Sequence, residues 1–576
     1  MSVSGNILCD KDKDSLAESL RLSVPRLSYM VSCLFVSRGI YDKDSFSQYV
    51  RPTLSQLHDP FLMTDMQKAV TRLNEAVAMN QKIMIYGDYD VDGTTSVALI
   101  YRFLRETVYT DKFLNFYIPD RYDEGYGITK KGIDTAYSWG AKLIIAIDCG
   151  SKAHEEISYA KSIGIDFIIC DHHQVDDILP DAVAMLNPMR QDDNYPFKYL
   201  SGCGVGYKLL QAFSISNNIN IRYLNKHLEL VALSIAADLV PVTGENRIFA
   251  YHGVRQLNSS PSIGVKGIIQ ISNLENKYID MNSISFKMSP RINASGRMMN
   301  GSKTVELLIS KDEETVKEKS REIESFNQER RELDTIVTKE AVKNIQRENL
   351  TSKKIIVVYN DNWHKGVIGI VASRLTDLYS KPVIVLTRDG NTFCGSARSV
   401  NGIDLYRAVE NSKDLLLNFG GHPYAVGMMM PAKNIDVFKA MIEEFAENNF
   451  ANEEYVQNIT IDACIDIDKI TPKLLSQLKL LSPFGVGNEE PVFMSKVFLY
   501  KNSFKNTAKD SKHLFIEIPN RNRYYKRIFG FAYKQSSSIT DKKDGFYQIA
   551  YTIQDISTET IKEIKINIKK ISEYKS

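Results

Sequence analysis

The amino-acid sequence predicts an α/β protein built on a parallel sheet, followed by a second α/β unit and a small β-barrel. Three observations predict this fold class. The chain has 576 residues, which is too long for one core and corresponds to three or four domains of about 150 residues each. From Lys82 onward short apolar strands alternate with helical segments, which is typical of βαβ units. Beyond residue 450 the segments alternate apolar and polar residues, as the strands of a small barrel do.

The parallel sheet is expected within residues 81–303, the main domain. Residues 1–80 are expected to be helical and to pack on this domain. A parallel sheet carries its chemistry at the carboxyl ends of its strands, so the residues after each strand matter most. The predicted strands and helices alternate through residues 82–88, 95–106, 112–121, 130–139, 141–151 and 166–174.

Acidic residues and histidines follow three of these strands, and another aspartate ends a predicted buried helix. Each alone has a structural explanation, such as a helix end, a loop start or a histidine satisfied within the core. Together they are expected at one edge of the sheet, where converging carboxylates repel one another unless a cation compensates. They are Asp88, Asp90 and Asp92 after the first strand, Asp148, the run Asp171, His172 and His173, and Asp238.

An oxygen-rich site with one or two imidazoles suits Mn²⁺ or Mg²⁺. Two such ions, about 3.5 to 4 Å apart, assist in-line attack of water on phosphorus, so the sequence predicts hydrolysis of a phosphate ester. The seven cysteines include no CxxC pair, which argues against a structural zinc site and fits a reducing compartment. No apolar run approaches the roughly 20 residues that cross a bilayer, and we expect a cytoplasmic protein without a membrane partner.

Charge is unevenly distributed along the chain. The net charge is only +2, yet residues 501–576 hold 16 Lys and Arg against 8 Asp and Glu. A lysine-rich surface without a ligand is one explanation. The stretch NRNRYYKRIFGFAYK instead favours single-stranded nucleic acid, because it interleaves cations with aromatic stacking faces. The candidate contacts are Arg523, Tyr524, Tyr525, Lys526 and Arg527, and the aromatic residues further along the same stretch are Phe529, Phe531 and Tyr533.

Residues 304–350 contain no Gly or Pro, are rich in Glu, Lys and Arg, and place apolar residues at helical intervals. A coiled coil is the alternative, but the apolar positions do not sustain clean heptads. We therefore expect one long helix that joins the main domain to the second α/β unit, residues 351–450. The groove between them is expected to admit a single strand and to exclude a duplex.

Several motifs carry a resemblance to a known family. DYDVDG, IAIDCGS, CDHHQ and SIAADLVP resemble the ordered motifs of the DHH phosphoesterase superfamily. IPDRYDEGYGI, LSGCGVGYKLL, MSPRINASGRMMN, WHKGVIGIVASRL, GSARS and FGGHPYAVGM resemble those of its RecJ family, bacterial exonucleases that degrade single-stranded DNA from the 5′ end. The resemblance covers about residues 20–500, and roughly the last 75 residues match more loosely.

The resemblance implies roles for the residues at the strand ends. Asp88 is expected to support the turn, and His173 to lie beside the metal and the scissile phosphate. Many superfamily members have a histidine where this chain has Tyr86, so the number of ions, one or two, stays open. The implied metal ligands are Asp90, Asp92, Asp148, His172 and Asp238.

The resemblance also implies a phosphate-binding groove. Arg121 is expected to face Ser396 and Arg398 across the groove between the catalytic domain and a DHH-associated domain at residues 351–450, forming a pocket for the 5′-terminal phosphate. Small residues let backbone N–H groups approach an anion, and an arginine fork matches phosphate oxygens. The further candidates for phosphate or strand contacts are His364, Gly420, Gly421 and His422, with Arg291, Asn293 and Arg297 nearby.

In this interpretation residues 451–576 form an oligonucleotide-binding (OB) fold. The implied activity is a 5′ to 3′ exonuclease on single-stranded DNA that releases mononucleotides in DNA repair and recombination, as a monomer with helicase and single-strand-binding partners. A phosphodiesterase of short oligoribonucleotides or cyclic dinucleotides is one alternative, and the basic-aromatic C-terminal stretch argues against it. A catalytically inactive DNA-binding scaffold is another, and the intact set of acidic residues argues against that.

Overall fold

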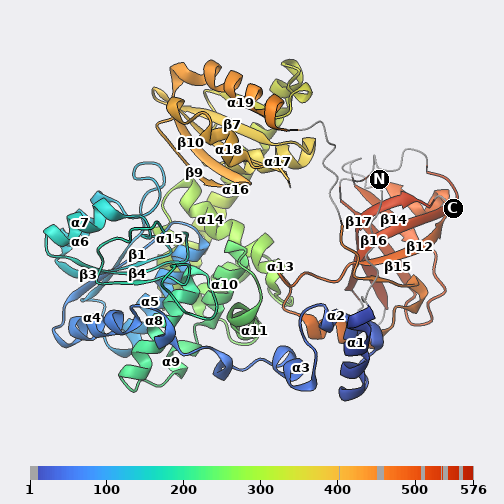
Figure 1. The fold of residues 1–576 in the computed structure, drawn as a ribbon, viewed down its shortest axis with the longest axis horizontal. Helices are drawn as coiled ribbons and strands as arrows, with labels where there is room; N and C mark the ends of the chain where they lie inside the picture. The colour runs from blue at the N-terminus through green and yellow to red at the C-terminus, as the bar shows by residue number, and fades with distance from the viewer. Residues whose placement is uncertain are drawn as a thin grey trace.

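The computed structural model describes residues 11–400, 402–450, 459–506, 513–533, 535, 542–556 and 562–574. The main and second α/β domains lie next to each other, and the C-terminal β domain lies to one side of them (Figure 1). No helix among the described residues has both the length and the apolar character needed to span a membrane.

The main domain is a five-stranded parallel sheet with helices on both faces. Its strand order is β2-β1-β3-β4-β5, and every pairing is parallel, as the alternation of elements predicts. Successive residues of a strand point to opposite faces, so Ile83 and Ile85 enter the larger core while Met84 and Tyr86 enter the smaller one. The strands are β1 (Lys82–Gly87), β2 (Leu114–Tyr117), β3 (Ala141–Ile147), β4 (Asp166–Cys170) and β5 (Ala184–Leu186).

Helices cover both faces of this sheet. The smaller core is closed by α6 (Lys130–Trp139) and α7 (His154–Ser162). The larger core lies between the sheet and a layer of helices, and one of these helices ends on Asp238. Its helices are α4 (Met66–Ala78), α5 (Val91–Thr107), α8 (Gly202–Ser216), α9 (Arg222–Asn225), α10 (Leu228–Asp238), α11 (Gly244–Ser259), α12 (Ile263–Ile271), α13 (Met281–Ser283), α14 (Ser289–Met298) and α15 (Ser302–Ile309).

The predicted single helix over residues 304–350 is wrong in one respect, because the chain forms two helices there. After α15 the backbone turns at residues 310–312, and α16 (Glu313–Arg347) begins anew. Asp312 caps α16, its Oδ2 accepting a hydrogen bond from the Thr315 N–H at 2.7 Å. The 35-residue α16 contacts α12, α14 and α15 along its first part and α17 and β6 further on, so it joins the two α/β domains.

The second domain is a mixed sheet of order β6-β7-β8-β10-β9. Only β6 and β7 pair in parallel, and the other pairs are antiparallel. Its strands are β6 (Ile356–Asn360), β7 (Val383–Asp389), β8 (Thr392–Arg398), β9 (Asn418–His422) and β10 (Ala425–Pro431), and its helices are α17 (Ile368–Tyr379), α18 (Leu405–Glu410) and α19 (Ile435–Asn449).

The C-terminal domain pairs its strands in the order β11-β12-β16-β17-β15-β14-β13. In the described residues no pair closes this sheet between β11 and β13. A short helix, α20 (Pro472–Leu478), precedes most of the strands. These are β11 (Ala463–Cys464), β12 (Phe493–Leu499), β13 (Phe504–Asn506), β14 (Leu514–Ile518), β15 (Arg527–Ala532), β16 (Gly545–Asp555) and β17 (Glu563–Glu573).

The N-terminal helices differ from expectation. Residues 57–76 join the core of the main domain, but α1 (Lys11–Ser23) and α2 (Tyr29–Val36) pack into the core of the C-terminal domain. Figure 1 shows both helices beside that domain, with α3 (Lys43–Val50) between it and the main domain. The sequence shows that Leu34 and Phe35 need a core, but an amphipathic pattern does not show which distant domain supplies it.

Candidate active site

The first acidic residues lie in a tight turn between β1 and α5. Asp90 caps α5, its Oδ1 accepting a hydrogen bond from the Gly93 N–H at 3.0 Å. A Cβ at Gly93 would lie 2.3 Å from the Asp88 carbonyl oxygen, so only glycine fits there. This close approach brings Asp88, Asp90 and Asp92 to one edge of the sheet.

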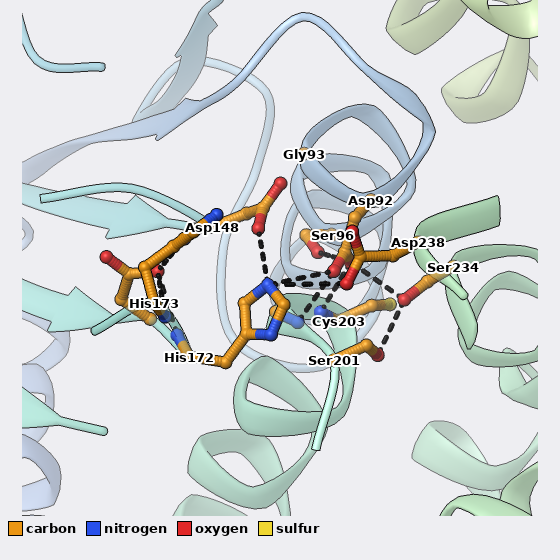
Figure 2. A network of polar contacts seen from close by, with 12 residues as sticks. Asp92, Gly93, Ser96, Asp148, His172, His173, Ser201, Cys203, Ser234 and Asp238 are labelled. Atoms are coloured by element: carbon orange, nitrogen blue, oxygen red, sulfur yellow. Dashed lines mark hydrogen bonds and ion pairs between the residues drawn. The ribbon is translucent and has the colours of Figure 1, made fainter. Parts of the chain in front are cut away.

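Asp92 is fixed by contacts that the sequence did not reveal. Its buried carboxylate accepts hydrogen bonds from the backbone N–H groups of Gly202 (2.7 Å) and Cys203 (2.8 Å) and from the Ser234 hydroxyl (2.7 Å) (Figure 2). The two N–H groups belong to the first turn of α8, where such donors have no partner within the helix. The motif LSGCGVGYKLL was therefore a signal for this support, although its partner could not be inferred.

His172 lies among three carboxylates. Its Nε2 is 3.1 Å from Asp148 Oδ1 and 3.6 Å from the Oδ2 atoms of Asp92 and Asp238. Asp148 follows β3 in the left-handed conformation with φ 60°, and Asp238 is the last residue of α10. Three strand ends and one helix end thus place these groups together, as the strand-end pattern predicts.

His173 is oriented by Asp171, a residue that we had placed at the strand end without giving it a role. The His173 Nδ1 lies 2.8 Å from Asp171 Oδ1, and Asp171 also accepts a hydrogen bond from the Ser151 N–H at 3.0 Å. On its other side, His173 Nε2 lies 3.3 Å from the hydroxyl of Tyr126. Burial alone would lower the pKa of His173, but the bond to Asp171 and the surrounding carboxylates raise it to about 9.

The carboxylates are strongly perturbed. Burial, followed by the charge of Asp92 and Asp90, raises the pKa of Asp238 to about 8. Burial and neighbouring carboxylates likewise raise the pKa values of Asp88, Asp90 and Asp148. Within the described residues the Oδ1 atom of Asp88 is buried without a hydrogen-bond partner. Such a cluster calls for a cation that would offset the repulsion between its charges.

The donor atoms are close enough to hold divalent cations. Three groups each offer ligand atoms within 4.8 Å of one another: Asp92, His172 and Asp238; Asp88, Asp90 and Asp148; and Asp148, His172 and His173. Carboxylate oxygens with imidazole nitrogens form a donor set that fits Mn²⁺ or Mg²⁺. Tyr86 is not part of this set, since its buried hydroxyl donates to the Gly127 carbonyl at 3.1 Å in the smaller core.

A second cluster consists of three arginines from three elements. Arg121 follows β2, Arg297 lies on α14 and Arg398 ends β8, so both α/β domains contribute. The Arg121 guanidinium lies over the ring of Tyr89 at 5.0 Å, and Tyr89 lies between Asp88 and Asp90 in the chain. Burial and then the charge of Arg121 lower the pKa values of Arg398 and of Arg297, the latter to about 10.

None of these three arginines forms a salt bridge with a carboxylate of the described residues. Arg398 donates to the Ser396 hydroxyl at 3.1 Å and to the Ala397 carbonyl at 2.7 Å, while Arg297 donates to the Gly366 carbonyl at 3.3 Å. Half-buried cations that repel one another and form no salt bridge would be stabilised by an anion such as phosphate.

His364 lies at the contact between the two α/β domains. Its Nδ1 accepts a hydrogen bond from the Gly366 N–H at 3.0 Å, and its ring meets that of Tyr122 edge to face at 6.1 Å. The Tyr122 hydroxyl donates to the carbonyl of Arg297. Tyr122 was not among the candidates from the sequence, although it stands next to Arg121 in a motif that we had singled out.

Other candidates occupy different surroundings. The guanidinium of Arg291 is engaged by Glu324 at 2.7 Å and by the Ile271 carbonyl at 2.9 Å, so it lies in internal contacts. Asn293 lies half-buried on α14, the helix that also carries Arg297. Gly420, Gly421 and His422 are exposed on the edge strand β9. In the part of the chain that the structure describes, no hydrogen bond joins these residues to the three arginines.

The basic stretch of the C-terminal domain is only partly available for stacking. Tyr525 is 3% exposed and belongs to the domain core, so its predicted contact with nucleic acid is wrong. Tyr524 is 40% exposed beside Arg523, whereas Arg527 lies between Glu517 and Glu563. Lys526 is exposed.

The aromatic face of this domain lies instead on β14 and β15. Phe515 and Phe529 stack with their ring centroids 5.2 Å apart, and Lys565 lies over the ring of Phe531 at 5.6 Å. These side chains alternate with the core residues of their strands and are half-buried. They offer ring faces next to a cation, which is the combination that binds single strands.

Fold and site together are those of the DHH class of proteins. The family models agree with this class: the N-terminal domain of the DHH family matches residues 82–235, the DHHA1 domain matches residues 352–448, and the RecJ OB domain matches residues 461–570. The chain belongs to the RecJ family. It is 30% identical over 481 residues to the single-stranded-DNA-specific exonuclease RecJ of Escherichia coli. The matched region covers 80% of this chain and 82% of that protein.

Further relatives extend this comparison. The chain is 35% identical over 485 residues to RecJ of Bacillus subtilis, across 84% of this chain, but it spans only 60% of the length of that relative. The crystal structure of RecJ from Thermus thermophilus in complex with Mn²⁺ has the same fold, with a TM-score of 0.83 and 22% identity over 99% of this chain and 79% of that one. An exonuclease RecJ bound to manganese matches with a TM-score of 0.59 and 27% identity, across 69% of this chain and 97% of that one.

Proposed function

We propose that the chain is a metal-dependent exonuclease that hydrolyses single-stranded DNA from the 5′ end to mononucleotides. One observation carries the polarity: Arg121, which clusters with Arg297 and Arg398 and forms no salt bridge among the described residues, lies over the ring of Tyr89, between Asp88 and Asp90 of the acidic cluster. A terminal phosphate held by the arginines would present the linkage next to it at the acidic cluster. The names of the relatives support the substrate class.

In this proposal the ions are Mn²⁺ or Mg²⁺, held by Asp90, Asp92, Asp148, His172 and Asp238. When bound, such ions activate water and neutralise charge that develops on the phosphate. The resident side chains prepare the site for them. The hydrogen bonds from α8 and Ser234 hold Asp92 in one orientation, which positions a ligand without further ordering at the moment of binding.

His173 is proposed to act on the scissile phosphate. Asp171 fixes its Nδ1, so Nε2 is the atom that faces the site beside Tyr126. In the metal-free site the bond to Asp171 and the neighbouring carboxylates raise the pKa of this imidazole to about 9 against the effect of burial, and Nε2 is the atom proposed to contact a phosphate oxygen. Asp88 supports the turn that presents Asp90 and Asp92, as its place beneath Gly93 suggests.

The terminal phosphate is proposed to bind Arg121, Ser396 and Arg398, with Arg297 and His364 at the same domain contact. The groove between the two domains would then guide one strand, and Asn293, Gly420, Gly421 and His422 are further candidates along it. On the C-terminal domain, Phe515, Phe529 and Phe531 would stack on the trailing bases, with Arg523, Tyr524 and Lys526 nearby.

We further propose that the protein works as a cytoplasmic monomer in DNA repair and recombination, supplied with single strands by a helicase and a single-strand-binding protein. A hydrolase that needs a free 5′ end and an unpaired strand depends on partners that open duplexes. The charge of +8 on residues 501–576 supports nucleic acid as its substrate.

The test compares single strands labelled at the 5′ or the 3′ end in the presence of Mn²⁺. A 5′ to 3′ exonuclease releases the 5′ label at once as a mononucleotide, while the 3′ label passes through progressively shorter strands. Release of the 3′ label first, or cleavage confined to dinucleotides, would contradict the proposal. Mn²⁺ is then replaced by Ca²⁺ to measure strand binding separately from strand hydrolysis.

A further inference from the structure

The chain that enters the C-terminal domain forms a small hairpin against the main domain. In residues 485–488, here called the junction hairpin, Gly485 and Asn488 exchange two backbone hydrogen bonds of 3.0 Å. The Val486 carbonyl accepts a third from the Val242 N–H at 2.7 Å. Val242 belongs to the five-residue loop 239–243 between α10 and α11, which begins directly after Asp238.

The contact between the hairpin and this loop is closely packed. A Cβ at Gly485 would lie 2.4 Å from Val242 Cγ2, and one at Gly487 would lie 3.4 Å from the Pro241 Cβ. Gly487 also has a φ of +73°, which favours glycine. Val242 is only 1% exposed and belongs to the core of the main domain, and its Cγ2 lies against Gly485. A larger residue at position 485 would have to displace Val242.

Arg247, near the start of α11, binds the backbone that leads into the junction hairpin. Its guanidinium donates to the carbonyls of Ser482 at 2.8 Å and Leu481 at 3.1 Å, and it lies 3.5 Å above the ring of Tyr49. It is 4% exposed, and burial lowers its pKa to about 10. No carboxylate of the described residues forms a salt bridge with it, so its donors serve to fix backbone carbonyls.

Asn488, the last residue of the hairpin, binds the same preceding backbone through its side chain. It donates to the carbonyls of Leu481 at 2.9 Å and Pro483 at 2.7 Å, and it accepts from Arg38 at 2.9 Å. The hairpin is therefore rigid with respect to both the C-terminal domain and the segment after α2. The loop that it touches also carries a bond from Asn246 to the Pro241 carbonyl at 3.0 Å, which ties it to α11.

Loop 239–243 follows Asp238, a proposed metal ligand, and begins with a sharp turn. Asp238 ends α10, and Leu239 follows in the left-handed conformation with φ 58°. Only three residues, 239–241, lie between Asp238 and Val242, so a displacement of Val242 would act on the backbone that carries the Asp238 carboxylate. The distance from Asp238 Oδ2 to His172 Nε2, 3.6 Å, depends on that path.

We propose that the junction hairpin is a positioning element for Asp238, and that through it the C-terminal domain sets the affinity of the metal centre. This inference rests on the proposed function in one respect, the assignment of Asp238 as a metal ligand. Removing the C-terminal domain would accordingly weaken the metal site as well as the binding of long strands. Among the described residues no hydrogen bond joins the hairpin to a proposed metal ligand, so in this proposal it acts through loop 239–243.

The test uses the full-length protein without DNA and measures Mn²⁺ binding by electron paramagnetic resonance. Gly485→Ala is expected to raise the Kd for Mn²⁺ about tenfold, which is the size of effect seen when groups behind metal ligands are changed. Adding Val242→Ala removes the Cγ2 atom that the new Cβ would meet, and the double variant should regain most of the affinity. Gly545→Ala is the matched control, because a Cβ there has no neighbour within 4 Å.

A second measurement examines the same coupling from the other side. Coupling between two sites is reciprocal, so Mn²⁺ should slow amide exchange in residues 485–488 as well as in 239–243 of the wild-type protein. In the metal-free Gly485→Ala protein the rate of amide hydrogen exchange in residues 239–243 should rise, while the rate in β3 and β4 stays the same. Should Gly485→Ala fail to fold, Arg247→Lys replaces it, with the same loss expected because a lysine cannot donate to several carbonyls in one plane.

The outcomes separate the inference from the proposed function. An unchanged Mn²⁺ affinity in a folded Gly485→Ala protein overturns the inference, and so does a loss that Val242→Ala fails to restore. Asp238→Ala is measured in parallel. If it lowers Mn²⁺ affinity while Gly485→Ala does not, only the positioning role is wrong. If Asp238→Ala has no effect on Mn²⁺ binding, the ligand assignment itself is wrong.

Discussion

Arg121 lies over the ring of Tyr89, with 5.0 Å between the guanidinium carbon and the ring centroid. Tyr89 is flanked in the chain by Asp88 and Asp90, so a single side chain separates the arginine cluster from the acidic cluster. A Cβ at Gly296 would lie 2.7 Å from the Tyr89 carbonyl, which shows how closely α14 covers this turn. The spacing between a terminal phosphate and the reacting linkage would therefore depend on this ring.

Tyr89→Leu should weaken the preference for 5′-phosphorylated strands, because Arg121 loses the ring face that holds its guanidinium. The loss is expected at about 0.5–2 kcal/mol, the range of a cation–π contact that is partly shielded from water. The measurement is the ratio of kcat/KM on 5′-phosphate and 5′-hydroxyl strands. Tyr89→Phe keeps the ring and serves as the control, and an equal loss in both variants would point to the hydroxyl instead.

Arg398→Ala should reduce activity on 5′-phosphorylated strands far more than on 5′-hydroxyl strands. Losing one hydrogen bond to a charged group corresponds to about 1.5–3 kcal/mol. Arg398→Lys should restore only part of the preference, because a point charge does not reproduce the fork of a guanidinium. Equal losses on both kinds of end would move Arg398 to the scissile phosphate or to a role in folding.

Asp238→Ala should abolish hydrolysis while leaving strand binding and the overall fold largely intact. Four aspartates of the site have raised pKa values, and removing one relieves repulsion in the metal-free protein. The thermal midpoint of the metal-free variant should thus equal or exceed that of the wild type, while stabilisation by added Mn²⁺ disappears. Asp181→Ala is the control, since the side chain of Asp181 is 75% exposed and pairs with Lys161. Near-normal hydrolysis by Asp238→Ala would refute its place among the ligands.

His227 gives a pH dependence that is separate from the metal centre. Burial lowers its pKa to about 4, against the effect of Glu106, whose Oε2 lies 3.3 Å away. The unfolded chain, with a histidine pKa of about 6.5, binds the proton more readily than the folded chain, so stability is lost as pH falls from about 6.5 towards 4. His227→Gln should remove that loss. Thermal midpoints in EDTA at pH 7 and pH 5 should therefore differ less in the variant, by a few degrees. An identical pH dependence in both proteins would contradict the assignment.

Replacing two aromatic residues of the C-terminal domain should affect different properties, strand binding in one case and thermal stability in the other. Phe529→Ala removes a half-buried ring that stacks on Phe515 and should weaken binding of long single strands by about 1–3 kcal/mol with little change in thermal stability. Tyr525→Ala removes a core residue and should lower the stability of this domain by about 3–5 kcal/mol. Titration of a fluorescent oligonucleotide and thermal melting distinguish the two effects. Strand affinity that is unchanged in Phe529→Ala would exclude this face as the stacking surface.

Much of the candidate site follows from local patterns. Asp148 and the pair His172 and His173 stand directly after apolar strands, and parallel strands end at one edge of a sheet, so their convergence could be predicted. The two-helix structure of residues 302–347 was within reach too, because an aspartate at the N-cap, Asp312, followed by acidic residues in the first turn, Glu313 and Glu314, is a recognised helix start. The burial of Tyr525 was not, since its neighbour Tyr524 has the same local chemistry and faces outward.

By itself the sequence determined the order of strands and helices, the acidic strand ends and the arginine motifs, because periodicity and the chemistry of strand ends are properties of neighbouring residues. Only the tertiary structure decided that Ser234 and α8 hold Asp92, that α1 and α2 complete the C-terminal domain, and that Gly485 packs on Val242. Those contacts join residues more than 100 positions apart. Their choice depends on which buried surfaces fit together once every domain has formed, and no local pattern encodes that fit.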